Sequence, residues 1–303
     1  MNIREILGDI KSDRKKKVIL DTDAYNEIDD QLAIAYFYYS EAVELLCVCA
    51  EHYIHERCNS RELGMNQSYD EIIKVLSLCD PHYKIPVCRG SISSIDDEDC
   101  AVESEAAERI ISIVRDSDEI VYVVAIGAIT NVVSAIMKAP DIVDKMCVLW
   151  VGCRPLAIGC PVEYNVEQDY RGAQLLYESG VSLIIVPDAG VTSTLRSPID
   201  CVSELRGANP VCDYLFDISN NAYHMVGCPP TWARTIWDLG APAIFETPEC
   251  AEYEIIPRPI LTDEQTYDFD DSRPEMIMVT ALDRDPIFKR AWEVLKNGKR
   301  KNQ

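Results

Sequence analysis

The chain has 303 residues, of which 48% are hydrophobic and 26% are charged, and this composition is ordinary for a globular protein. Its formal net charge of −22 argues against nucleic acid and anionic membrane as partners, because neither is attracted to so negative a protein. No apolar stretch has the length of a signal peptide or of a membrane span, so we expect a cytoplasmic protein.

The thirteen cysteines are an odd number and are scattered through apolar runs such as LLCVCA and KMCVLWVGC. We expect them to be small buried hydrophobic residues, and no Cys-x-x-Cys pair with partnering histidines indicates a zinc site. The two basic clusters, Lys11 to Lys17 and Lys296 to Lys301, lie near the chain ends and are interpreted as solvated tails.

Apolar strands and apolar-periodic helices alternate along the first two thirds of the chain. We expect strands at 18–20, 43–50, 84–87, 120–125, 146–152 and 181–186, with helices at 28–36, 68–78, 101–114, from about 130, and at 170–179. Beyond Pro187 the pattern predicts helices at 199–205, 211–225 and 231–245, and a closing helix at 286–296. It also predicts two late strands at 251–256 and 276–281, for which an antiparallel pairing is one option. No linker interrupts residues 1–303, so the sequence predicts a single α/β domain: a Rossmann-like, mostly parallel sheet with helices on both faces.

Four aspartates, Asp21, Asp23, Asp29 and Asp30, follow the strand at 18–20. In open α/β sheets the carboxyl ends of the strands are where ligands bind, so we expect the active site there. Four like charges in ten residues are costly to desolvate, and a hard cation with oxygen ligands is the simplest compensation. The alternative is that Asp29 and Asp30 only cap the following helix.

At this point the sequence resembles a known family. Four segments, 17–30, 125–131, 163–169 and 237–238, are similar, in matching order, to the inosine–uridine-preferring nucleoside hydrolases. The resemblance implies an enzyme that hydrolyses the N-glycosidic bond of a ribonucleoside or related N-riboside with the help of calcium. It also implies a small-molecule nucleoside substrate and a homo-oligomer, either a dimer or a tetramer.

The resemblance assigns a role to individual residues. Asp23 is implied to bind Ca²⁺ and to act as general base on the metal-bound water, and Asp21 to support the neighbouring carboxylates. Asp29 is implied to bind the ribose hydroxyls. The remaining implied calcium ligands are Asp30, Asp238 and the backbone carbonyl of Thr130, and the remaining implied substrate contacts are Glu163, Asn165 and Trp237.

Three departures from the family pattern stand out. The turn between Asp23 and Asp29 is two residues longer than the family's Pro-Gly turn. The family's Gly-Asn pair after the second strand is replaced by Glu51-His52, so that His52 or His55 is a candidate for the asparagine's place. Trp237 stands where some members have a histidine that protonates the leaving base, as in purine-preferring members that stack the base on an aromatic ring.

Two other functions are compatible with parts of the sequence. A strand followed by Asp-x-Asp also opens the haloacid dehalogenase-type phosphohydrolases, although Tyr25 stands where those proteins have Thr or Val. A non-catalytic nucleoside- or sugar-binding protein on the same fold would account for the longer turn and the missing Gly-Asn pair.

Overall fold

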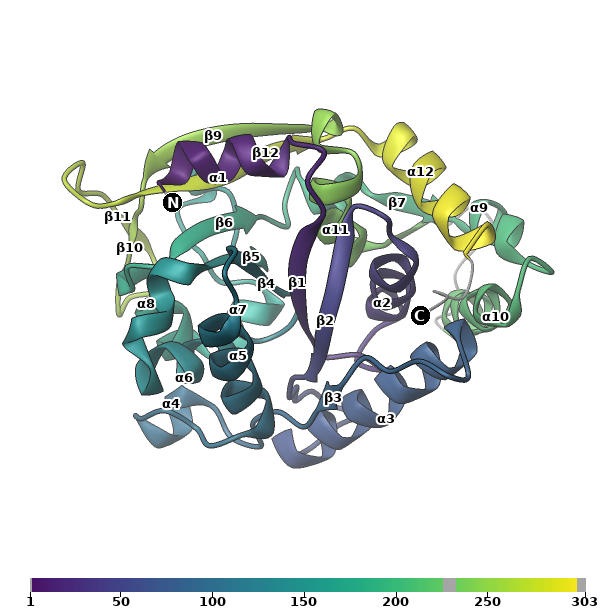
Figure 1. Cartoon of the computed structure of the whole chain (residues 1–303), viewed down its shortest axis with the longest axis horizontal. Helices are drawn as coiled ribbons and strands as arrows, with labels where there is room; N and C mark the ends of the chain where they lie inside the picture. Colours follow the sequence, from purple (N-terminus) through teal and green to yellow (C-terminus); the bar gives the residue numbers. More distant parts are fainter. Residues whose placement is uncertain (1, 226–232, 299–303) are drawn as a thin grey trace.

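A computed structural model describes residues 2–225 and 233–298, which build one large sheet wrapped by helices (Figure 1). The sheet has eight strands in the order β3 (Val87–Cys88), β2 (Val43–Ala50), β1 (Lys16–Thr22), β4 (Val121–Ala125), β5 (Met146–Val151), β6 (Ser182–Val186), β12 (Glu275–Leu282) and β9 (Ala251–Pro257). Every neighbouring pair is parallel except β12 and β9, which are antiparallel. The predicted α/β class and the antiparallel late strands are thereby confirmed.

Helices cover both faces of the sheet. They are α1 (Ile3–Ile10), α2 (Asp29–Tyr39), α3 (Arg61–Cys79), α4 (Ile95–Glu98), α5 (Glu105–Asp116), α6 (Thr130–Lys138), α7 (Tyr164–Gln168), α8 (Tyr170–Glu178), α9 (Ile199–Val202), α10 (Pro210–Met225), α11 (Gly240–Glu246) and α12 (Arg284–Lys296). Figure 1 shows α5, α6 and α8 on one side of β1, and α2, α11 and α12 on the other. Two short strand pairs, β7 (Arg196–Pro198) with β8 (Ala233–Thr235) and β10 (Ile260–Leu261) with β11 (Tyr267–Asp268), complete the described strands.

The two cores follow from the two-residue period of a strand. Val18 and Leu20 of β1 point into the core beneath α2, α11 and α12, whereas Ile19 between them points into the core beneath α5, α6 and α8. Successive side chains of a strand lie on opposite faces, so a parallel strand buried on both sides must be apolar throughout. This is why the central strands are continuous apolar runs.

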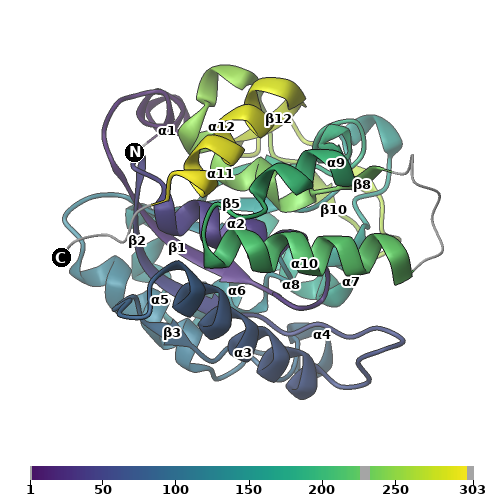
Figure 2. The ribbon, with the colours of Figure 1, turned by 90° about the vertical axis from the view of Figure 1, so that its right-hand side faces the viewer.

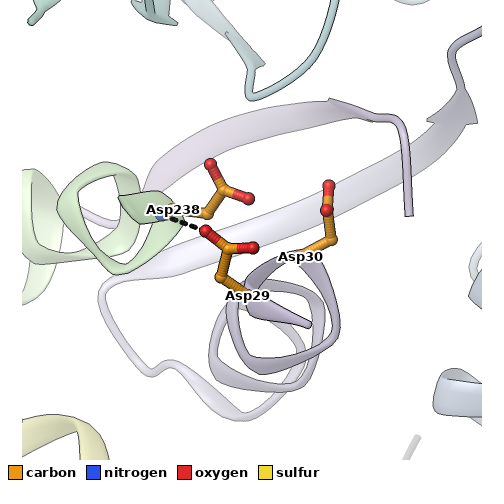
Figure 3. Close-up of side chains that lie close together, drawn as sticks. All are labelled: Asp29, Asp30 and Asp238. Carbon is orange, nitrogen blue, oxygen red and sulfur yellow. Dashed lines mark hydrogen bonds between the residues drawn. The ribbon is translucent and has the colours of Figure 1, made fainter. Parts of the chain in front are cut away.

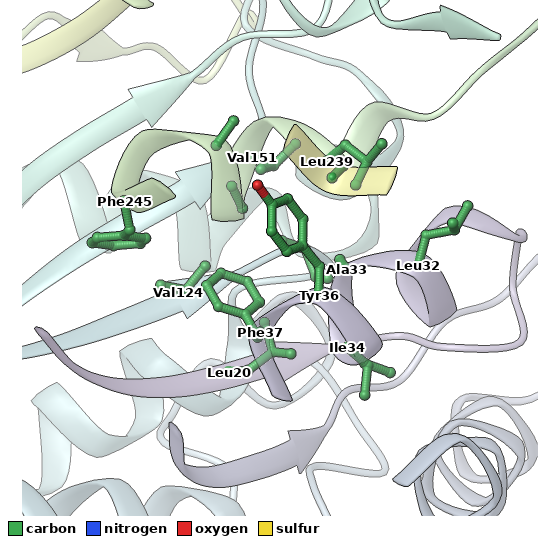
Figure 4. Packing of buried hydrophobic residues seen from close by; sticks show 14 of the residues in the cluster. Leu20, Leu32, Ala33, Ile34, Tyr36, Phe37, Val124, Val151, Leu239 and Phe245 are labelled. Carbon is green, nitrogen blue, oxygen red and sulfur yellow. The ribbon is translucent and has the colours of Figure 1, made fainter. Parts of the chain in front are cut away.

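Helix α2 is buried around its whole circumference (Figure 4). It packs between the sheet and α3, α11 and α12, with Phe37 against Phe245 at a ring-centroid distance of 6.3 Å. Helix α10 lies alongside α3 and also contacts α2 (Figure 2). A helix with apolar residues on every face is held by packing on all sides, so the N-terminal end of α2, which carries Asp29 and Asp30, is rigidly placed.

Two of the expectations are wrong. The segment predicted as a helix over 231–245 contains β8, a 3₁₀ turn at Trp237–Leu239 and the short α11, because residues 233–235 pair with β7. The cluster from Lys11 to Lys17 is not a solvated tail, since Lys16 belongs to β1 and is buried, with its ammonium group hydrogen-bonded to the carbonyl of Ser12. Trp232 and Lys299 to Lys301 lie outside the described residues.

Twelve cysteines have free thiols in the described part of the chain. Seven of them are buried in the two cores, which confirms for these seven the predicted role as small hydrophobic residues. These seven are Cys47, Cys49, Cys79, Cys88, Cys147, Cys153 and Cys212. None of the helices described is both long enough and apolar enough to cross a membrane.

Candidate active site

A cavity of about 410 Å³ lies over the carboxyl ends of the central strands. Its walls come from the segments that follow β1, β2, β4, β5 and β6, together with the 3₁₀ turn at 237–239. Seven of the eight residues that the resemblance assigns to calcium or substrate line it, and Thr130 does not: Asp23, Asp29, Asp30, Glu163, Asn165, Trp237 and Asp238. The fold therefore brings together segments that are far apart in the sequence.

Three carboxylates form a tight cluster in this cavity (Figure 3). Asp29 and Asp30 open helix α2, and Asp238 approaches from the 3₁₀ turn. One carboxylate oxygen from each lies within 4.8 Å of the others, and the backbone N–H of Asp238 donates to Asp29 Oδ2 at 3.4 Å. Calcium binds oxygen at 2.3–2.6 Å, so ligand oxygens on one ion are at most about 5 Å apart. The spacing of these three carboxylates fits one such ion.

Asp23 lines the same cavity at the end of β1. Its Oδ2 accepts a hydrogen bond from Asn26 Nδ2 at 3.0 Å. The backbone that follows β4 approaches the Asp23 side chain closely at Gly127, where a Cβ atom would lie 2.7 Å from Asp23 Oδ1. A larger residue at this position would therefore displace the Asp23 carboxylate. The lengthened turn that follows Asp23 holds the exposed Tyr25 at φ 80°, a left-handed conformation, and still brings Asp29 into the cavity.

Burial raises the pKa of every aspartate in this group. Loss of hydration is the largest cause, and it brings the pKa of Asp23 to about 8 and that of Asp29 to about 7. The pKa values of Asp30 and Asp238 also lie well above their ordinary range, first through burial and then through repulsion by neighbouring carboxylates. Neutral pH would therefore leave protons on the cluster unless a cation replaced them, which is the chemistry of a metal site.

A buried polar network lies beneath the cavity. Asp21 does not line the cavity; its Oδ1 accepts from Asn131 Nδ2 at 2.9 Å, and its buried Oδ2 has no partner among the described residues. Glu51 accepts from the backbone N–H of Asn131 at 3.0 Å and from that of His52 at 2.9 Å. The first of these hydrogen bonds satisfies a free N–H at the start of α6, so Glu51 supports this end of the helix.

Thr130 belongs to this network rather than to the cavity wall. The hydroxyl of Thr130 donates a hydrogen bond to the Asp169 carboxylate, and His52 Nε2 lies 3.0 Å from the Thr130 hydroxyl oxygen. As the first residue of α6, Thr130 directs its carbonyl along the helix toward the next turn. Ile126, at the end of β4, does line the cavity, and its carbonyl lies 3.4 Å from Asn165 Nδ2.

Glu163 and Asn165 are held firmly by backbone contacts. Glu163 is the N-cap of α7, and its carboxylate accepts from the N–H groups of Cys153, Asn165 and Val166 at 2.9–3.1 Å. Burial raises the pKa of Glu163 to about 7 despite these hydrogen bonds. Asn165 Nδ2 also donates to Val151 O at 2.8 Å. Its Nδ2 is thus directed at the backbone, and its Oδ1 remains an acceptor.

Of the histidines, His55 lines the cavity and His52 does not. The ring of His55 stacks on Tyr53 with 5.4 Å between centroids, and its Nδ1 accepts from the N–H of Arg57 at 2.9 Å, which places the proton of a neutral ring on Nε2. The side chain of His224 lies outside the described part of the structure. Trp237 lines the cavity and is 37% exposed, so it is not a buried core residue.

Several lining residues were missed by the sequence reasoning: Asn26, Glu27, Arg57, Ile126, Arg154, Tyr164, Asp188 and Thr192. A signal for some of them was present, since Arg154 and Asp188 each follow a predicted parallel strand within three residues. The rule that ligands bind at the carboxyl ends of strands applies to them as much as to Asp23.

Comparisons with solved structures show the same fold. An inosine-guanosine nucleoside hydrolase superposes with a TM-score of 0.75 at 17% identity, covering 93% of this chain and 99% of that one. A purine-preferring ribonucleoside hydrolase from Gardnerella vaginalis gives a TM-score of 0.73 at 20% identity, covering 93% and 98%. A plant nucleoside hydrolase gives 0.74 at 17% identity, covering 94% and 100%.

Sequence comparison is more specific. The chain is 30% identical to the pyrimidine-specific ribonucleoside hydrolase RihA of Klebsiella pneumoniae subsp. pneumoniae over 158 residues. That match spans 48% of this chain and 50% of the relative, so it covers about half the length of the curated protein. The profile of the inosine-uridine preferring nucleoside hydrolases matches residues 18–289, which is most of the chain and includes every lining residue of the cavity. The chain therefore belongs to the inosine-uridine preferring nucleoside hydrolase family, not to the haloacid dehalogenase-type phosphohydrolases.

Proposed function

We propose that this protein hydrolyses the N-glycosidic bond of a ribonucleoside, or of a related N-riboside, and releases the base and ribose. The observation that carries the proposal is the cluster of Asp29, Asp30 and Asp238 beside Asp23 in a cavity whose remaining wall includes Glu163 and Asn165. Family membership gives the reaction class, and the cluster supplies the groups that the reaction needs.

The metal we propose for the cluster is calcium. Its ligands would be the carboxylates of Asp23, Asp30 and Asp238, and the carbonyl of Ile126, which lines the cavity, in place of that of Thr130, which does not. Asp29, the third member of the carboxylate cluster, would lie beside the ion and bind the ribose hydroxyls. The oxygen-only donor set and the 4.8 Å spacing support a hard cation of this size. Such an ion would act as a Lewis acid, and it would lower the pKa of a water bound to it.

Asp23 is the proposed general base. A carboxylate in this position accepts the proton of the attacking water, and such a contribution is typically worth roughly 10²–10⁴-fold in rate. The sugar develops positive charge as the bond to the base breaks. Asp29 and Glu163 place negative charge beside it, which stabilises the transition state electrostatically.

The base would lie beyond C1′, where Trp237 offers a stacking surface and the N–H at Nε2 of His55 is a hydrogen-bond donor.

We also propose a cytoplasmic homo-oligomer, a dimer or tetramer, that acts on small-molecule nucleosides in purine or pyrimidine salvage. The net charge of −22 supports the exclusion of nucleic acid and membrane as partners.

The test is a panel of purine and pyrimidine nucleosides assayed for reducing sugar, with calcium and after treatment with EGTA. We expect release of ribose that depends on calcium, and a loss of at least roughly 10²-fold in kcat for Asp23→Asn. The matched control is Asp271→Asn, which changes an exposed aspartate outside the cavity.

Calorimetry with the same nucleosides separates the remaining possibilities. Binding without turnover, unchanged in Asp23→Asn, would show a non-catalytic nucleoside- or sugar-binding protein instead. Full activity of the metal-free protein would contradict the role of the carboxylate cluster.

A further inference from the structure

The side chain of Asp23, the proposed general base, depends on one neighbour for its direction. Of the side chains in the described part of the chain, only that of Asn26 donates to its carboxylate, from Nδ2 to Oδ2 at 3.0 Å. The carboxylate of Glu163, by contrast, is fixed by three backbone N–H groups at 2.9–3.1 Å. Loss of the Asn26 amide would therefore free the Asp23 carboxylate to rotate.

A tight turn of the backbone brings Asn26 back to Asp23. The N–H of Asn26 donates to the carbonyl of Asp23 at 3.2 Å, which closes a four-residue β-turn. Tyr25, the third residue of this turn, has φ 80°, as a type II turn requires, although glycine ordinarily takes this conformation. Strain that is kept at a non-glycine residue is typical of functional positions. This turn lies in the segment that is two residues longer than the Pro-Gly turn of the family.

The amide of Asn26 is itself oriented by a second segment of the chain. The hydroxyl of Tyr164, in α7, donates to Asn26 Oδ1 at 3.2 Å and lies 3.5 Å from the carbonyl of Ile54. A hydroxyl donor at Oδ1 and a carboxylate at Nδ2 distinguish the two ends of the amide, because a reversed amide would set its oxygen against the carboxylate. The segments that follow β1, β2 and β5 thus meet at Asn26.

The charges beside Asp23 explain why a neutral donor suits this position. The carboxylates of Asp29, Asp30 and Asp238 line the same cavity. Like charges repel, so an Asp23 side chain without a donor at Oδ2 would turn away from them. A lysine or arginine would also hold the carboxylate, but its positive charge would compete with the cation proposed for the cluster. The amide of Asn26 holds the carboxylate without adding a charge.

We propose that Asn26 is a positioning residue for catalysis: its amide, oriented by Tyr164, holds the Asp23 carboxylate in the direction from which it accepts the proton of the attacking water. This inference rests on the proposed nucleoside hydrolysis. Asn26 does not take the proton itself, because an amide nitrogen only donates hydrogen bonds. Its contribution is geometric and requires the carboxylate of Asp23.

The experiment measures kcat and KM of Asn26→Ala at saturating calcium with the most rapidly hydrolysed nucleoside. A carboxylate that keeps its charge but loses its direction forfeits part of the contribution of a general base, so kcat should fall roughly 10–30-fold and KM should change less than about threefold. Asn26→Asp keeps the size of the side chain but removes the donor, and its kcat should fall at least as far. Tyr164→Phe removes only the hydroxyl and should lower kcat by roughly 2–5-fold.

Two double variants test whether Asn26 acts through Asp23. In the Asp23→Asn background, Asn26→Ala should lower kcat by less than about twofold, because the carboxylate that it positions is absent. Tyr164→Phe should likewise add little to Asn26→Ala, since both act through the same amide. Independent structural effects would multiply instead.

A control and a structural measurement separate positioning from folding. The matched control is Asn66→Ala, which removes another partly buried asparagine, bonded to Arg89 and to the carbonyl of Glu62 and not part of the cavity wall. It should behave as the wild type, and thermal unfolding checks that every variant is folded. Crystal structures of the wild type and of Asn26→Ala give a readout that is independent of activity. We expect the Asp23 carboxylate to change its direction in the variant.

Three results would overturn the inference: an unchanged kcat in Asn26→Ala, a rise in KM alone, which would make Asn26 a substrate contact, or losses that multiply in the double variants. If the wild type hydrolyses nucleosides through Asp23 and Asn26→Ala keeps the wild-type kcat, only this inference fails. If the wild type hydrolyses no nucleoside, the proposed reaction fails and the crystal structures decide the positioning role. That role then stands if the Asp23 carboxylate turns in Asn26→Ala and fails if it does not.

Discussion

Replacing Asp238 by asparagine should have opposite effects on the metal-free and the calcium-bound protein. In the metal-free state, Asp29, Asp30 and Asp238 hold carboxylate oxygens within 4.8 Å of one another. Two unit charges at that distance repel by about 3.5 kcal/mol at an effective dielectric constant of 20. Their raised pKa values show that part of this repulsion is already relieved by protonation, so we expect Asp238→Asn to stabilise the metal-free protein by about 1–3 kcal/mol at pH 8.

Calcium should reverse this order. At a calcium concentration of about 1,000 times Kd, binding to the folded state alone stabilises the wild type by about 4 kcal/mol. The variant has lost a charged ligand, so calcium should stabilise it by less than half as much. For a chain of this length, about 2 °C in Tm corresponds to 1 kcal/mol, and thermal unfolding can therefore resolve both effects.

The pH dependence gives a second check with a definite sign. Asp23 and Asp29 have pKa values of about 8 and about 7 in the folded, metal-free protein, against about 3.9 when unfolded. Between these values the folded state binds more protons than the unfolded state, so stability rises as the pH falls from 8 toward 4. We expect a higher Tm at pH 5.5 than at pH 8 in EGTA, and a smaller stabilisation by calcium at pH 5.5.

Unfolding of the wild type, Asp238→Asn and the control Asp271→Asn in EGTA and in calcium completes the test. The control changes an exposed aspartate and should follow the wild type. The reasoning is refuted if Asp238→Asn destabilises the metal-free protein, or if calcium stabilises the variant and the wild type equally.

Two further predictions concern buried charges away from the cluster. Burial lowers the pKa of His52 to about 3, so below its unfolded value of about 6.5 the unfolded state binds an extra proton and stability is lost as the pH falls toward 3. Denaturant titrations of His52→Gln should accordingly fall less steeply, by up to about 1.4 kcal/mol per pH unit; parallel pH profiles would contradict this. Arg258 is 1% exposed, and its guanidinium donates to Ser179 O and Val181 O at 2.6 Å. Arg258→Met leaves both carbonyls unpaired and should lower the free energy of unfolding by about 2–4 kcal/mol, whereas a variant as stable as the wild type would show that these hydrogen bonds contribute nothing net.

Local sequence determined much of the fold. Continuous apolar runs such as 43–50 and 121–125 specify strands buried on both faces, and their alternation with helical segments specifies a parallel sheet. These patterns depend only on side-chain period and burial. They failed over 231–245, where pairing of β8 with β7 overrides an apolar run that resembles a helix.

The candidate site could be predicted only in part, because strand ends are visible in the sequence but side-chain directions are not. Asp23, Asp29 and Asp30 follow β1 and could be found from that position alone. The sequence alone cannot show that Glu51 and His52 turn under the cavity to support α6, or that the carbonyl of Thr130 is directed along that helix. Those directions depend on hydrogen bonds to residues up to 80 positions away.

The order of strands decided the rest. Asp238 meets Asp29 although 209 positions separate them, because the 3₁₀ turn before α11 packs onto α2. Arg154 and Asp188 meet because β5 and β6 are neighbours and both end at the same edge of the sheet. The amino-acid sequence by itself thus specified an acidic, ligand-binding sheet edge, through periods and charges that are local. Which groups face one another across that edge is a property of the tertiary structure, since it depends on which strands and helices become neighbours.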